Sequence, residues 1–135
     1  MDDNQLLVKH PIGRTPHPFL GTVYAVSEKG KPSQTHVKVI ERGKGQTLVE
    51  VQLHTGRPHQ IRIHLSAAGF PLVGETFYTK KGNPRQDPGA TPATPGYLLH
   101  AHRLTFEHPV HEQPVTVLAP LPPRLVLGFQ QNRPY

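Results

Sequence analysis

The stretch His54–Gly69, HTGRPHQIRIHLSAAG, constrains this chain more than any other. It combines two arginines and three histidines with apolar residues at helical spacing. Gly56 permits a tight turn, Pro58 suits a first helical turn, and Gly69 is a favourable helix stop. The stretch therefore predicts one well-marked helix over about residues 58–68.

The predicted helix carries two stripes of side chains at its repeat of about 3.6 residues. The apolar stripe, expected to face a core, consists of Ile61, Leu65 and Ala68. The polar and basic stripe consists of His59, Arg62 and Ser66. Arg62 lies beside Leu65, so its guanidinium would project from a rigid support into a cleft. From this pattern alone, a surface helix with a solvated basic face is an equally good interpretation.

Proline and glycine shape the rest of the chain. Sixteen prolines and twelve glycines among 135 residues predict many turns and short strands around a single core. We therefore expect one α+β unit over residues 1–135, mostly antiparallel strands with one main helix. Residues 80–96 have almost no apolar content and are expected to form a flexible surface loop.

Alternating apolar and polar residues predict the strands. Two antiparallel hairpins are expected, the first leading directly into Thr55, which would cap the helix. The expected strands cover residues 6–8, 19–26, 35–40, 47–53, 97–106 and 115–119. Residues 9–18 read as a loop broken by proline and glycine, and residues 124–129 as a short helix.

The charge balance favours a polyanionic partner. Fifteen lysines and arginines oppose nine acidic residues, a net charge of +6, which makes nucleic acid the leading candidate. The chain has no cysteine, no apolar run long enough to span a membrane, and a start unlike a secretory signal, so a cytoplasmic location is expected. No metal site is predicted, because His54, His59 and His64 are five residues apart and do not share a helix face.

Several motifs together resemble the RluA-type pseudouridine synthases. The most specific is the string TGRPHQIRIHL at residues 55–65, followed by GFPLVGETFY at residues 69–78. Three further pieces fall in the family's order: PIGR at 11–14, GKPSQT at 30–35, and LLHA at 98–101 with His108-Pro109. The resemblance extends from about residue 6 to residue 120.

This resemblance implies isomerisation of uridine to pseudouridine in structured RNA, either rRNA or tRNA and not DNA, without metal or cofactor. In such enzymes an aspartate attacks, a tyrosine packs by the target base, and a basic residue pairs with the aspartate. Arg62 would be that basic partner, holding the carboxylate ionised. The remaining residues implied in RNA contact or in the pocket are Arg14, Thr55, Arg57, His59, Gln60, Ile61 and Leu99.

The chain also departs from the family's pattern. The HRLDxxTSG-like segment that carries the aspartate is absent, as is the tyrosine element before the PIGR loop, and Tyr24 does not replace it. Glu75 stands where the family usually has aspartate. We therefore expect the C-terminal half of a catalytic domain, inactive alone, either truncated or completed by a separate chain, with Arg62 lacking its carboxylate. The alternatives are an RNA-binding module without catalysis and a remnant without function.

Overall fold

The computed structural model describes residue 1 and residues 3–125. The chain divides into two compact units, Met1–Tyr97 and the residues from Leu98 onward. Antiparallel strands dominate both, and the described residues contain a single α-helix, so the expected α+β class is confirmed.

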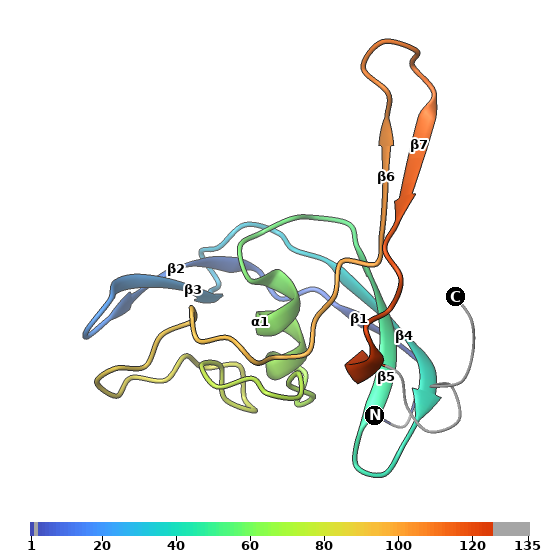
Figure 1. Ribbon diagram of the computed structural model, residues 1–135. Helices are drawn as coiled ribbons and strands as arrows, with labels where there is room; N and C mark the ends of the chain where they lie inside the picture. Colours follow the sequence, from blue (N-terminus) through green and yellow to red (C-terminus); the bar gives the residue numbers. More distant parts are fainter. Residues whose placement is uncertain (2, 126–135) are drawn as a thin grey trace. The chain divides into compact units, whose positions relative to one another are not determined.

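The first unit contains one helix and five strands (Figure 1). Their bounds are β1 Gln5–Val8, β2 Ile12–His17, β3 Gly21–Val26, β4 Thr35–Arg42, β5 Thr47–Leu53 and α1 Gln60–Ala67. Strands β1, β4 and β5 form an antiparallel sheet in the order β1-β4-β5, and β2 and β3 form a separate antiparallel ribbon. The hairpin predicted from the alternation over residues 35–53 is therefore confirmed as β4–β5.

The core of this unit lies where α1 packs between the ribbon and the sheet (Figure 1). Its central cluster consists of Ile12, Val23, Ile63, Phe77 and Tyr78. Phe77 and Tyr78 follow α1 in the chain and fold back onto it, since they share this cluster with Ile63. The predicted apolar stripe is only partly right, because α1 is enclosed on most sides and its central core residue is Ile63 rather than Ile61.

The two ends of α1 differ in how well the sequence predicted them. The helix begins at Gln60, and the expected N-cap, Thr55, is wrong: His59 occupies that position with a left-handed φ of 56° and no side-chain cap bond. The predicted stop is confirmed. Gly69 has a φ of 89°, its N–H bonds to the Ser66 carbonyl, and the next N–H, from Phe70, reaches the Leu65 carbonyl.

Two further expectations concern segments rich in proline. Residues 12–17 form strand β2, not a loop, since they pair with β3 from Ile12↔Val26 to His17↔Gly21. Pro16 is tolerated there because β2 is an edge strand. Residues 80–96 contain no regular strand or helix, only a bridge from Tyr78 to Pro84, and their flexibility stays a prediction.

The second unit contains the second predicted hairpin, formed by β6 Arg103–Glu107 and β7 Pro114–Leu118. β6 is shorter than the strand expected over residues 97–106. A short 3-10 helix, η1 Pro123–Leu125, overlaps the helix expected over residues 124–129, of which residues 126–129 lie outside the described part. Within the described residues no helix is long and apolar enough to cross a membrane.

Candidate functional site

Arg62 lies at the centre of the candidate site. It projects from α1, but its guanidinium does not enter an open cleft, because the side chain is only 2 % exposed. Nε and Nη2 donate to the two carboxylate oxygens of Glu75 at 2.7 and 2.8 Å, and Nη1 donates to the Pro92 carbonyl at 2.7 Å. The solvated basic face is therefore wrong for this residue.

Glu75 is the carboxylate that pairs with Arg62. Its side chain is fully buried, and besides the arginine it accepts the backbone N–H groups of Phe77 and Tyr78, at 3.0 and 3.3 Å. Burial alone would raise the pKa of Glu75, but the bonds from Arg62 and from the two amides outweigh it and lower that pKa. Arg62 therefore has a carboxylate partner within this chain, whereas its pairing with a nucleophilic aspartate stays a prediction.

Two tyrosines enclose the arginine. Its Cζ lies 4.1 Å from the ring centroid of Tyr97 and 5.5 Å from that of Tyr78, within the range of cation–π attraction. The Tyr78 hydroxyl donates to the Tyr24 carbonyl at 2.7 Å, which ties this ring to the ribbon. The ion pair is thus held in one orientation by bidentate hydrogen bonds and by aromatic packing.

A second network joins α1 to the start of β4. Gln60, 3 % exposed, accepts the Thr55 hydroxyl and the Arg57 N–H, and its amide nitrogen donates to the Gln34 carbonyl and to Thr35 Oγ1. All four hydrogen-bonding positions of this side-chain amide are therefore satisfied. Gln60 and Thr55, expected to contact RNA or the pocket, are both engaged in this network within the chain.

His64 completes the network in the neutral state. Its Nε2 lies 2.7 Å from the His10 carbonyl and must donate, so Nδ1, 2.7 Å from Thr35 Oγ1, accepts the threonine proton. The ring is completely buried, which is the main reason that the pKa of His64 is lowered. Protonation would place a second donor against the threonine in a buried position.

We expect the stability of the chain to fall on acidification below about pH 6.5, the ordinary pKa of histidine. The pKa of His64 is lower in the folded state than in the unfolded state, so the unfolded state binds the extra proton first. The stabilisation is complete above pH 6.5 and is lost as the pH falls through the folded pKa. Urea unfolding measured between pH 7.5 and 5 tests this expectation. His64→Gln should flatten the profile and the exposed control His54→Gln should not; equal profiles for both would contradict it.

Within the first unit, no side-chain hydrogen bond joins Arg14, Arg57 or Ile61 to the Arg62–Glu75 pair. Arg57 donates from Nε and Nη2 to the Pro32 carbonyl at 3.3 and 2.9 Å. Arg14 is exposed on β2, where Nε donates to the Tyr24 hydroxyl at 3.2 Å. Ile61 is half-buried, and Leu99 is an exposed residue of the second unit. Their roles in RNA contact stay predictions.

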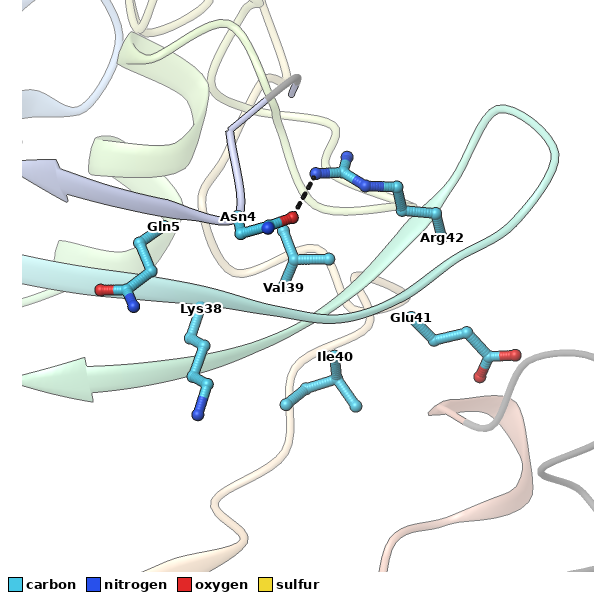
Figure 2. A pocket seen from close by; sticks show the side chains of 7 residues that line it. All are labelled: Asn4, Gln5, Lys38, Val39, Ile40, Glu41 and Arg42. Atoms are coloured by element: carbon cyan, nitrogen blue, oxygen red, sulfur yellow. Dashed lines mark hydrogen bonds between the residues drawn. The ribbon is translucent and has the colours of Figure 1, made fainter.

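A hollow of about 550 Å³ lies along β4. It is lined by Asn4, Gln5, Lys38, Val39, Ile40, Glu41 and Arg42. Figure 2 shows Lys38 and Ile40 on the side of the strand away from Asn4 and Arg42. Arg42 donates to the Asp3 carbonyl and to Asn4 Oδ1, so it tethers the N-terminal residues. None of the predicted site residues lines this hollow, and its polar groups do not converge on one point.

Comparison with known proteins identifies the family. The profile described as RNA pseudouridylate synthase matches residues 7–67, which include the end of β1, strands β2–β5 and α1 with Arg62 and His64. An RNA pseudouridine synthase of Synechocystis sp., described as uncharacterized, is 44 % identical over 115 residues, covering 85 % of this chain and 40 % of that protein. The chain belongs to the RNA pseudouridine synthase family.

Two further relatives are also named as pseudouridine synthases. RNA pseudouridine synthase 5 of Oryza sativa is 36 % identical over 145 residues, which is 90 % of this chain and 36 % of the rice protein. Ribosomal large subunit pseudouridine synthase D of Neisseria meningitidis (strain Z2491) is 41 % identical over 121 residues, or 85 % of this chain and 31 % of the bacterial protein. The chain thus spans 31–40 % of the length of these three relatives.

Three residues in the networks around Arg62 and His64 were not predicted from the sequence. They are Thr35, Tyr97 and, in its role as the partner of Arg62, Glu75. Thr35 lies 29 residues before His64, and Glu75 lies 13 residues after Arg62. The GETFY string around Glu75 was a usable signal for the carboxylate, since the backbone amides of Phe77 and Tyr78, two and three residues further on, donate to it. Nothing in the pattern pointed to the other two residues. The described residues contain no group of three or more histidines and acidic residues arranged to hold a metal ion.

Proposed function

We propose that this chain is the arginine-bearing part, the C-terminal half, of an RNA pseudouridine synthase catalytic domain. The observation that carries the proposal is the rigid placement of Arg62 within the segment that matches the family. A guanidinium has five N–H donors, and the three hydrogen bonds to Glu75 and Pro92 leave one N–H on Nη1 and one on Nη2. Those two donors would suit a second carboxylate once the residues that enclose the guanidinium move aside, since the side chain is only 2 % exposed.

The nucleophilic aspartate would come from outside residues 1–135, either from the same polypeptide or from a separate chain. Glu75 is a poor nucleophile, because it is fully buried and accepts hydrogen bonds from the Arg62 guanidinium and from two backbone amides. Arg62 would keep the incoming carboxylate ionised and oriented. Structured RNA, rRNA or tRNA, is the proposed substrate, and the cytoplasm is the proposed location.

A chimera tests this function. The matched segment of the Neisseria synthase D would be replaced by this chain, and pseudouridine formed in a large-subunit rRNA transcript would be measured by nucleoside chromatography. We expect the chimera to convert uridine and this chain alone to be inactive. In the chimera, Arg62→Lys should abolish turnover with little loss of RNA affinity, whereas Arg85→Lys, at an exposed ion pair, should not.

The outcomes separate the alternatives. Turnover by this chain alone would mean that the nucleophile has been misplaced. Unchanged turnover in the Arg62→Lys chimera would refute the role of Arg62. A folded chimera that binds RNA without turnover would favour the second candidate, a non-catalytic RNA-binding module, which the net charge of +6 also supports.

A further inference from the structure

Residues 86–95, which we call the strap, run between two fixed points of the first unit. At the first point, the Arg85 N–H donates to the Phe77 carbonyl at 2.9 Å. At the second, Gly96 packs so closely on Gly74 that a β-carbon added to Gly74 would lie 2.2 Å from the Gly96 carbonyl oxygen. The strap is therefore held at both of its ends.

Between these points the strap is weakly attached. Within the described residues it contains neither helix nor strand. A single described hydrogen bond joins it to residues outside 84–97, and that bond runs from Arg62 Nη1 to the Pro92 carbonyl at 2.7 Å. Ala90 packs, partly buried, against the core cluster. The bond from Arg62 is therefore the main polar attachment of the strap.

Two further features would make the strap easy to open. A hollow of about 280 Å³ adjoins Pro92, with Tyr24 and His59 on its other walls, so this side of the strap lacks close-packed partners. Gly89 has a φ of 80°, and glycine adopts or leaves this conformation at little cost. A segment with few buried contacts opens locally at a low free energy while the rest of the fold stays intact.

The strap supplies the most weakly held group around the Arg62 guanidinium. The groups that contact this guanidinium are the Glu75 carboxylate, the rings of Tyr78 and Tyr97, and the Pro92 carbonyl. Glu75 and Tyr78 are each fixed by a further hydrogen bond to the backbone, and Tyr97 directly follows the second fixed point. Displacement of the strap would therefore free Nη1 and leave the ion pair with Glu75 intact.

We infer that the strap is a removable cover of Arg62, whose Pro92 carbonyl occupies the place of the incoming carboxylate until that group displaces it. The inference rests on the proposed function and adds a conformational step to it. A carboxylate attracts a guanidinium more strongly than a neutral carbonyl does, so its arrival would shift the strap toward the open state. Without that carboxylate, the closed strap keeps the guanidinium out of water.

Hydrogen exchange in this chain alone tests whether the strap opens by itself. NMR would follow the guanidinium protons of Arg62 and, as the reporter of global unfolding, the amide of the buried Ile63, which bonds to the His59 carbonyl. We expect the exchange of the guanidinium protons to be nearly independent of low concentrations of urea, and that of the Ile63 amide to rise steeply with urea. An equal urea dependence would overturn the inference, because the guanidinium would then reach water only by global unfolding.

Two matched glycines separate local opening from a general loss of stability. Gly89 in the strap and Gly45 in the β4–β5 turn have φ values of 80° and 67°, and an added β-carbon would meet no atom within 4 Å at either position. A β-carbon in this left-handed region disfavours the native conformation on the order of tenfold. Gly89→Ala should therefore accelerate exchange of the Arg62 guanidinium by about that factor. Gly45→Ala should not, since its strain persists when the strap opens, although both variants should accelerate exchange of the Ile63 amide. Equal guanidinium exchange in the two variants would overturn the inference.

Sodium acetate is the carboxylate probe. It should shift the amide signals of Ala90 and Ala93 in a saturable manner, whereas sodium chloride at the same ionic strength should not. Absence of a saturable shift, or equal shifts with both salts, would refute displacement by a carboxylate. The proposed function is tested separately by turnover of the chimera, so an active chimera together with a strap that opens only on global unfolding would refute this inference alone.

Discussion

Arg62→Ala is expected to lower the free energy of unfolding by about 3–5 kcal/mol, the range found when one partner of a buried ion pair is removed. The truncation leaves the Glu75 carboxylate fully buried with only two backbone amides as partners. It also removes the hydrogen bond to the Pro92 carbonyl and the stacking against Tyr97. Urea unfolding at pH 7.5 measures the effect.

The matched control is a second arginine–carboxylate pair of this chain. Arg85 and Asp87 also meet at 2.8 Å, but their side chains are 49 % and 48 % exposed, so Arg85→Ala should cost at most about 1 kcal/mol. The double substitution Arg62→Met with Glu75→Leu should be less damaging than Arg62→Ala alone, since it buries no unpaired charge. Equal costs for Arg62→Ala and Arg85→Ala would show that the buried pair contributes little.

Thr35→Val is expected to cost about 2–4 kcal/mol, although the two side chains have nearly the same shape. The Thr35 hydroxyl is completely buried, donates to His64 Nδ1 and accepts from the amide nitrogen of Gln60. Valine would leave that ring nitrogen and one amide N–H buried without a partner, at about 1–3 kcal/mol each.

The control for this substitution is Thr105→Val. Thr105 also bonds to a polar side chain, Thr116 Oγ1 at 2.9 Å, but both residues are exposed on the β6–β7 hairpin and water can replace the lost bond. Its cost should be within about 0.5 kcal/mol of zero. A Thr35→Val protein as stable as Thr105→Val would mean that the network does not hold α1 to β4.

These two networks bear on function through rigidity. Arg62 is oriented by Glu75 from a loop, and its helix is fixed at the N-terminal end by Gln60 and Thr35. A group that must meet an incoming carboxylate acts best when its own position is set beforehand. On the proposed function, a loss of either network would therefore reduce turnover in the chimera as well as stability.

Local patterns predicted much of the fold. The alternation over residues 35–53 and 97–119 identified both hairpins, and Gly69 identified the end of α1, because each depends on near neighbours in the chain. The predictions were wrong where residues distant in the chain determine the local structure. Residues 12–17 form a strand because β3 lies beside them, and Thr55 does not cap α1 because its hydroxyl is directed to Gln60.

By itself, the sequence determined the family, the α+β class, and the position of Arg62 on the one helix of the described residues. Only the tertiary structure decided that Arg62 is enclosed, that Glu75 is its partner, and that Tyr24, His59 and Pro92 line one hollow. The physical reason is that helix and strand patterns repeat along the chain. A buried charge, in contrast, takes whichever partner the folded backbone brings within hydrogen-bonding distance.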